Sequence, residues 1–298
     1  MLQQVQKIAA PLSRKAVLVS VNISQWTARK LDKKVTKEVN TSHGAAEDAG
    51  RYNKLLIEAE RLTRITSIVS KARALHYAYT KPWADEGPRI LPNALFSKFS
   101  TEFRELKREF AAEVDEFCLN YTKFVEERKA ALNGLYDPKD YPAESEVRGK
   151  FNLDITVLPF PDADDWRADL DDETMADIRA EIEAATVKAV DVANADTVKR
   201  IVEIVGNMAT RLGEYGTQVP GKKRTFFSDT LVSNVRDLAA LLPAFNLNDD
   251  PKLTEITDRI NRELCVEEPD TLRDNKNVRA SVKQSADEIL ADVSKYLA

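Results

Sequence analysis

The pattern of hydrophobic and polar positions predicts a mainly α-helical chain. Three long segments carry apolar side chains every three or four residues, and this spacing places them on one face of a helix. They are residues 47–78, 93–132 and 172–215. Shorter segments with the same period predict further helices at residues 228–242, 251–264 and 277–297.

Two of these helices have clear start signals. Pro251 follows Asp250, and proline is favoured at the first position of a helix, where its missing N–H is not needed. Asp171 or Asp172 can accept hydrogen bonds from the first free N–H groups of the segment 172–215. We expect that helix to be long, with a break near Asn194.

The segment 93–132 has the most regular apolar seam. Steps of three and four residues average 3.5, which is the coiled-coil period, along Phe96, Phe99, Phe103, Leu106, Phe110, Val114, Phe117, Tyr121 and Phe124. Phenylalanine rings are bulky, so we expect three or four helices to surround them. At ~1.5 Å per residue the segment would span roughly 60 Å. A seam of this length is hard to bury within one chain, so we also expect self-association.

Only two stretches have the alternation of β-strands. Residues 16–23 alternate with β-branched side chains on one side, and residues 151–157 do so before Pro159 and Pro161 end the run. An isolated strand leaves its backbone groups unpaired, so we expect the two to pair in a small sheet.

These elements together define the expected fold class. We predict a mainly α, elongated bundle of long coiled-coil-like helices with a small two-stranded β-sheet. The expected division is an N-terminal segment with a strand (1–46), a long-helix body that includes the second strand (47–220) and a C-terminal bundle of shorter helices (221–298).

Composition agrees with a helical protein that has a heavily charged surface. The 298 residues include 31% charged residues, only 9 Gly and 12 Pro, and the formal net charge is −5. Two cysteines are too few for a disulfide framework or a zinc site made of cysteines. We find no signal-peptide pattern and no apolar run long enough to span a membrane, so we expect a cytoplasmic protein in a bacterial host cell.

One stretch resembles a phosphate-binding loop without meeting its requirements. Gly216–Lys223 reads GTQVPGKK, but Lys223 stands where the loop needs a hydroxyl for Mg²⁺. A phosphate-binding loop also follows a strand, whereas this stretch follows a predicted helix. We interpret it as a basic loop between two helices.

Other catalytic and metal-binding patterns are missing from the sequence. His43 and His76 lie far apart, and the acidic run PDADDWRADLDDE has Trp166 and Arg167 where a calcium loop needs an oxygen ligand and glycine. Cys118 lies beside the Phe seam, which indicates a buried, inert thiol. We therefore expect no cofactor, no metal and no enzyme activity.

Two segments are candidate protein-binding surfaces. The connector 79–92 contains three prolines and a glycine together with Trp83 and Arg89, and it is either a partner surface or a hairpin that caps the helix ends. The acidic run supplies the other candidate residues, Asp164, Asp165 and Trp166. Residues 151–200 hold thirteen acids against five bases, and residues 1–40 hold eight bases against two acids. This asymmetry marks either a polar partner surface or opposite ends that meet within one fold.

Nucleic-acid binding is the alternative function. Lysine and arginine near aromatic rings can neutralise phosphates and stack on bases. Two basic stretches have this composition, and their candidate residues are Trp26, Arg29, Lys30, Lys33, Lys34, Lys222, Lys223 and Arg224. The acidic net charge and the absence of a recognised module make this interpretation second to protein binding.

Four stretches together resemble a known family. They are VLVSVNISQWTARK, TKPWADEGPRILP, YPAESEVRGKFNLDITVLPFPDADDWR and FFSDTLVSNVRDLAALLPAFNLNDDP, and the resemblance covers about residues 15–255. The family consists of uncharacterised bacteriophage and prophage proteins that are catalogued as a domain of unknown function. Its genes often lie near those of a MoxR-like or CobS-like AAA+ ATPase and a von Willebrand A-like protein. The resemblance therefore implies a non-catalytic scaffold with one of these proteins as its partner, and it supplies no active-site residues.

Overall fold

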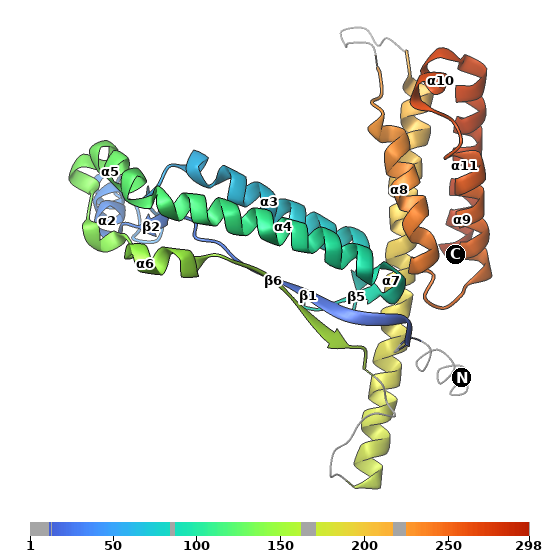
Figure 1. Cartoon of the computed structure of the whole chain (residues 1–298), viewed down its shortest axis with the longest axis horizontal. Helices are drawn as coiled ribbons and strands as arrows, with labels where there is room; N and C mark the ends of the chain where they lie inside the picture. The colour runs from blue at the N-terminus through green and yellow to red at the C-terminus, as the bar shows by residue number, and fades with distance from the viewer. Residues whose placement is uncertain (1–11, 13, 84–86, 162–170, 217–224, 298) are drawn as a thin grey trace. The chain divides into compact units, whose positions relative to one another are not determined.

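The structure is a computed structural model that describes residues 12, 14–83, 87–161, 171–216 and 225–297 (Figure 1). Helices dominate the described residues, as the sequence predicts. The chain forms two compact units. Unit 1 comprises residues 1–20, 79–97 and 157–298, and unit 2 comprises residues 21–78 and 98–156. Both units are discontinuous in sequence.

Helices α3 (Thr63–Tyr79), α4 (Asn93–Leu119) and α5 (Tyr121–Leu132) supply most of the core of unit 2. Arg64 of α3 pairs with Glu113 of α4 at 3.5 Å, and the His76 and Phe99 rings lie 6.4 Å apart, so α3 and α4 run side by side (Figure 1). Much of the predicted seam is buried within the chain, namely Phe99, Phe103, Phe110, Val114, Phe117 and Tyr121. The seam therefore no longer argues for self-association.

The predicted helix 93–132 is interrupted at one residue. Asn120 separates α4 from α5 and has a ψ of 0°, and its side-chain amide donates to the Glu116 carbonyl at 2.9 Å. Asparagine readily bonds to nearby backbone in this way, which competes with continued helix. Between residues 133 and 150 the chain forms only short helical turns, at Asn133–Leu135, Pro138–Asp140, Glu144–Val147 (α6) and Arg148–Lys150.

The predicted helix 47–78 is wrong over its first half. Residues Asn53–Leu55 form strand β3, which pairs antiparallel with β2 (Arg29–Leu31), and a 3-10 turn follows at Ala59–Leu62. A short helix that the sequence analysis missed, α2 (Lys33–Ser42), lies between the two strands in the chain. Pairing with β2 satisfies the backbone of β3 and competes with helix formation there.

The predicted strands form part of a larger sheet. In unit 1, the first half of β1 (Ala16–Ser24) pairs antiparallel with β5 (Arg89–Pro92), and β5 pairs with β4 (Lys81–Pro82). In unit 2, the second half of β1 lies beside β6 (Asn152–Pro159), where Asn22 donates to the Thr156 hydroxyl at 2.8 Å. Pairing of the two predicted strands is confirmed, but the sheet has four strands where we expected two. β4 and β5 are too short to show alternation.

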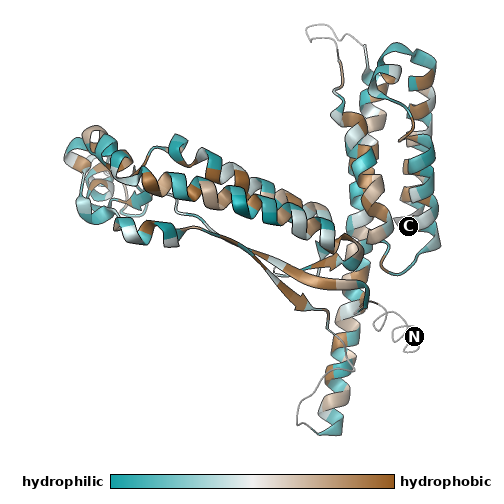
Figure 2. Ribbon diagram, in the orientation of Figure 1, coloured by the Kyte–Doolittle hydropathy of each residue, from teal (hydrophilic) through white to brown (hydrophobic). Residues whose placement is uncertain are grey.

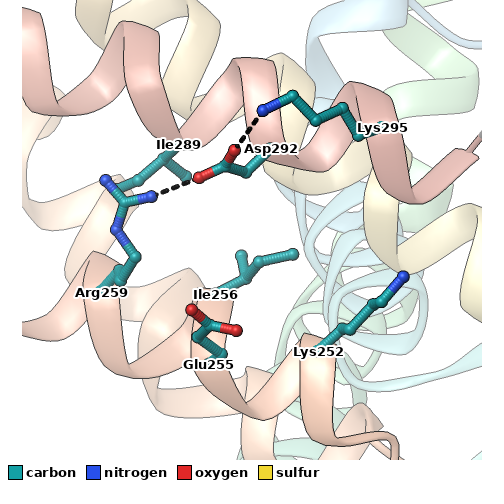
Figure 3. A pocket seen from close by; sticks show the side chains of 7 residues that line it. All are labelled: Lys252, Glu255, Ile256, Arg259, Ile289, Asp292 and Lys295. Carbon is teal, nitrogen blue, oxygen red and sulfur yellow. Dashed lines mark hydrogen bonds and ion pairs between the residues drawn. The ribbon is translucent and has the colours of Figure 1, made fainter.

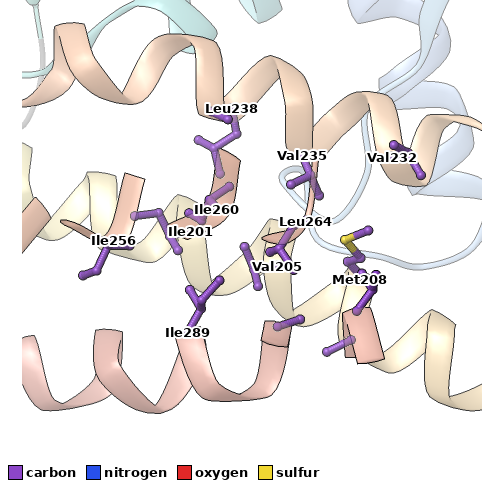
Figure 4. Packing of buried hydrophobic residues seen from close by; sticks show 14 of the residues in the cluster. Ile201, Val205, Met208, Val232, Val235, Leu238, Ile256, Ile260, Leu264 and Ile289 are labelled. Atoms are coloured by element: carbon purple, nitrogen blue, oxygen red, sulfur yellow. The ribbon is translucent and has the colours of Figure 1, made fainter. Parts of the chain in front are cut away.

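A helical bundle holds the larger core of unit 1. Its helices are α7 (Asp172–Glu214), α8 (Thr230–Phe245), α9 (Pro251–Glu263), α10 (Pro269–Asp274) and α11 (Lys276–Leu297). Side chains from four of them interlock around Ile201, Val205, Val235, Ile260 and Ile289 (Figure 4). Hydrophobic positions recur along one side of these helices (Figure 2), so the amphipathic pattern drives their packing.

Most of the predicted helices of unit 1 are confirmed. α7 begins at Asp172, where Asp171 accepts from the Thr174 N–H, and it shows no break at Asn194. α8, α9 and α11 begin and end within three residues of their predicted bounds, but α10 was missed. None of the helices in the described part of the chain is both long and apolar enough to cross a membrane.

Candidate functional site

The connector between α3 and α4 is a β-hairpin. Lys81 lies opposite Ile90, and Pro82 lies opposite Arg89. The Arg89 guanidinium donates to the Thr80 hydroxyl at 2.8 Å and to the Thr80 carbonyl at 3.4 Å. Arg89, one of the predicted partner-binding residues, therefore helps to hold the hairpin on which it lies.

Lys81 points inward from this hairpin and has 0% exposed surface. Its Nζ lies 3.2 Å from Asp196 Oδ2 on α7 and 3.7 Å from the centroid of the Phe245 ring on α8. Arg200 Nε pairs with the same Asp196 oxygen at 2.8 Å, and Arg200 also donates to the Thr80 carbonyl at 2.8 Å. The cluster therefore ties the hairpin to both α7 and α8.

The surroundings of Lys81 change its protonation. The pKa of Lys81 is lowered to about 7, chiefly by burial and also by the positive charges of Arg200 and Arg89, whereas Asp196 opposes the shift. A neutral lysine amine is a nucleophile. However, a side chain with no exposed surface cannot be reached by a substrate, so we interpret Lys81 as a structural anchor.

Trp83 lies beside this anchor and is only partly buried. Its ring meets the Phe160 ring edge-on, with centroids 4.8 Å apart, against a small core that includes Leu18, Ile90 and Ala193. Trp83 therefore combines a packed side with an exposed side. This arrangement suits both interpretations that the sequence left open.

Six other predicted residues lie outside the described part of the chain. They are Asp164, Asp165 and Trp166 of the acidic run and Lys222, Lys223 and Arg224 of the second basic stretch. The pattern that resembled a phosphate-binding loop falls there as well, from residue 217 onward.

The first basic stretch forms part of unit 2. Trp26 is half-buried and makes edge contacts with Phe117 and Tyr121 at centroid distances of 6.3 and 6.0 Å. These contacts occupy much of the ring that nucleic-acid binding was expected to use for stacking.

The four bases of this stretch are exposed on β2 and α2. Arg29 and Lys30 lie on β2, and Lys33 and Lys34 begin α2. Lys30 pairs with Asp140 at 3.2 Å. Lys33 lines a hollow along α2 and Arg29 lines another beside Leu55, so the four bases do not line one hollow.

A buried ion network links β3 to the residue between β2 and α2. Lys54 of β3 is 6% exposed and pairs with Asp140 at 2.5 Å and with Asp32 at 3.1 Å. It also donates to the Leu135 carbonyl at 3.1 Å. Burial lowers the pKa of Lys54, but its hydrogen bonds to Asp140 and Asp32 outweigh burial and raise the pKa overall.

The two carboxylates of the network shift in the opposite direction. A hydrogen bond from the Val35 N–H is the main cause that lowers the pKa of Asp32, which also caps α2. Burial raises the pKa of Asp140, but hydrogen bonds from Lys54 and Lys30 outweigh it, so the pKa falls. All three groups are therefore charged at neutral pH and stabilise one another.

A groove runs along α2 beside this network. It has a volume of about 520 Å³ and lies between α2 and the loop of residues 43–52. Lys33, Lys37 and Arg51 contribute positive charge to its lining, and Leu31 contributes an apolar surface. This groove combines charge and apolar surface in unit 2.

A second hollow lies between α9 and α11 in unit 1. Ile256 and Ile289 are among the residues that line this space of about 280 Å³ (Figure 3). Arg259 and Lys295 both pair with Asp292, at 2.5 and 3.0 Å (Figure 3). Lys252 and Glu255 also line this hollow, so its charge is mixed and favours no one class of ligand.

Sequence reasoning missed the Lys81 cluster and the Lys54 network. Both depend on residues far apart in the chain, as the separation of Lys81 from Asp196 shows. The only local signal was the i,i+4 pair of Asp196 and Arg200 beside an apolar stripe. Such pairs are common on helix surfaces, so the sequence could not distinguish this one from an ordinary surface ion pair.

Among the described residues, no group of three or more His, Cys, Asp or Glu side chains is arranged to hold a metal ion. Comparisons of the chain with protein-family models, curated proteins and solved structures found no match.

Proposed function

We propose that this protein is a non-catalytic interaction or scaffold protein of the bacteriophage type, acting in the cytoplasm of a bacterial host. Its partner would be a MoxR-like AAA+ ATPase or a von Willebrand A-like protein, as the family resemblance implies. Self-association would accompany this role. The proposal rests chiefly on the first turns of α7, which contain no buried residue.

Only part of the length of α7 is buried in the helical bundle. It runs for 43 residues, roughly 65 Å at ~1.5 Å per residue. Its buried residues begin at Thr186 and continue to Leu212, and residues 172–185 contain none. A helix of that length is usually stabilised by packing of an apolar face, so the first turns offer a surface for another chain.

This surface is amphipathic. Met175, Ile178 and Ile182 form a half-exposed apolar stripe at helical spacing, and acidic residues such as Asp177 and Glu181 surround it. An apolar stripe within a charged rim is the usual composition of a surface that binds a partner helix. The Lys81 anchor contacts α7 farther along the helix, at Asp196.

The test substitutes the stripe without touching the core. Ile178→Asp combined with Ile182→Asp should leave the melting temperature within about 2 °C, because neither side chain is buried. The same variant should lose co-purification with a co-expressed MoxR-like ATPase. Ala180→Asp, on the opposite exposed side of the helix, is the matched control and should retain the complex.

Two results would reject this assignment. One is a complex that survives the double substitution with unchanged affinity. The other is a wild-type protein that binds neither the ATPase nor the von Willebrand A-like protein at micromolar concentration. Light scattering of the purified wild type tests self-association separately, and a monomer would remove that part of the proposal.

A further inference from the structure

The groove along α2 has walls that are held in place by the chain itself. Asn40, which is buried, donates from its side-chain amide to the carbonyls of Glu47 and Gly50 at 2.9 and 3.3 Å. The Tyr52 N–H donates to the Thr36 hydroxyl at 3.0 Å, which fastens the end of the loop to the helix. The groove is therefore formed before any ligand binds, which lowers the entropy cost of binding.

Glycine is required at one point of this loop. Gly44 has a φ of +62°, where side chains are disfavoured, and it directs the chain away from the end of α2. Gly50 approaches Asn40 closely, since a Cβ there would lie 3.1 Å from Asn40 Oδ1. The tight loop thus depends on the same asparagine that holds the wall.

The described lining of the groove has a small net positive charge. Lys33, Lys37 and Arg51 are exposed in its lining, and no ion pair joins any of them to an acid within the described residues. Glu47 and Asp48 also line the groove, so its charge is mixed with a positive excess. Unpaired lysine and arginine at a surface favour an anionic ligand.

The lining also has an apolar part. Leu31, at the end of β2, is 39% exposed and contributes to the groove together with the exposed Ala45. A ligand that fills the groove must place an apolar group there to gain from burying this surface.

We propose that the α2 groove binds an acidic peptide segment of a partner protein. Its carboxylates would pair with Lys33, Lys37 and Arg51, and an apolar side chain would pack on Leu31 and Ala45. The proposal rests on the interaction role stated above, but it uses a surface in unit 2, separate from the first turns of α7.

Single-stranded nucleic acid fits the groove less well. The Trp26 ring is engaged with Phe117 and Tyr121, so stacking would require it to leave those contacts. Glu47 and Asp48 in the lining would repel a continuous row of phosphates. A peptide can avoid this repulsion by placing amide or basic groups opposite the two acids.

The experiment measures binding of a fluorescein-labelled synthetic peptide of Asp, Glu, Leu and Asn by fluorescence anisotropy with the full-length protein. Affinity should fall about tenfold or more for the variant Lys33→Glu with Lys37→Glu, and similarly for Arg51→Glu. It should also fall as salt rises, because the charges are exposed. Lys71→Glu with Arg73→Glu, an exposed pair on α3, changes the net charge equally and should bind like the wild type.

Further measurements distinguish specific binding in the groove from nonspecific attraction between opposite charges. A peptide with Leu replaced by Ser should bind about tenfold more weakly, and Leu31→Ser in the protein should abolish that difference. Circular dichroism confirms that each variant is folded. Equal binding of the Leu and Ser peptides would overturn the proposal, as would normal binding by the Lys33 and Lys37 variant.

Tighter binding of a labelled oligothymidine that the same charge reversals abolish would overturn the proposal in favour of nucleic acid. The α7 variants with Ile178→Asp and Ile182→Asp should bind the peptide normally. A result that rejects peptide binding in the groove can therefore be distinguished from one that rejects the proposed function of α7.

Discussion

Lys81 brings a charge into a place without solvent contact, and its partners offset the cost. Asp196 and the face of the Phe245 ring favour the ammonium, while burial and the nearby guanidinium groups favour the neutral amine. Arg200 cannot take over the role of Lys81, because it is already bonded to Asp196 and the Thr80 carbonyl.

This arrangement predicts that the free energy of unfolding rises as the pH increases above 7. The pKa of Lys81 is about 7 in the folded state and near 10.5 in the unfolded chain. Between these values the unfolded state binds more protons, so the free energy of unfolding rises with pH. Lys81→Met should remove this rise, which is on the order of 3 kcal/mol from pH 7 to pH 9.5. Urea denaturation at both pH values measures it, and equal slopes for wild type and variant would contradict it.

The Lys54 network predicts the opposite sensitivity, to acid. The pKa values of Asp32 and Asp140 are lowered by folding, so their stabilisation is present above about pH 4 and is lost as pH falls through the folded-state values. Lys54→Met leaves two largely buried carboxylates without the cation that they share and should cost about 3 kcal/mol at pH 7. Lys139→Met, an exposed neighbour of Asp140, is the control and should cost less than about 0.5 kcal/mol.

Unfolding of the Lys54→Met variant should also be less sensitive to pH between 5 and 3 than unfolding of the wild type. Chemical denaturation followed by circular dichroism measures both effects. A variant as stable as the Lys139→Met control would show that the network contributes nothing net.

At the scale of single elements, α9 shows how local sequence places a helix end. Asp250 accepts hydrogen bonds from the N–H groups of Lys252 and Leu253, and Pro251 occupies the first helical position. These groups would otherwise lack partners. Both residues were recognisable in the sequence, and the helix begins where they predict.

Loss of this cap should therefore have a defined cost. Asp250→Ala should lower the free energy of unfolding by about 1 kcal/mol. Asp258→Ala, an exposed site within the same helix, should change it by less than about 0.5 kcal/mol. Thermal melts of the two variants make the comparison, and equal melting temperatures would show that the cap contributes no stability.

At the scale of the whole molecule, the two units have cores of their own. The core of unit 1 includes Ile201 and Ile260, and that of unit 2 includes Phe103 and Val114. We predict two calorimetric transitions, because each unit has its own set of internal contacts. Ile260→Ala and Phe103→Ala should each lower a different transition, at a cost of about 2–5 kcal/mol.

Hydrogen exchange of the two variants checks the assignment. Ile260→Ala should increase exchange in α8, α9 and α11 and leave α4 protected, while Phe103→Ala should have the reverse effect. A single transition that both variants lower equally would show that the units unfold as one.

The sequence by itself determined the elements whose signal is local. The long helix α7, the start of α9 at Asp250 and Pro251, and strands β1 and β6 were predicted because periodicity and capping depend on residues close in the chain. The side-chain pattern of the Phe seam was also correct, since most of its rings are buried.

Only the tertiary structure decided which distant groups meet. β3 is a strand because β2 pairs with it, and Lys81 is buried because α7 supplies Asp196. Backbone pairing and charge burial depend on partners tens to more than a hundred residues away. A local pattern carries no information about such partners, so these features emerge only when the chain folds.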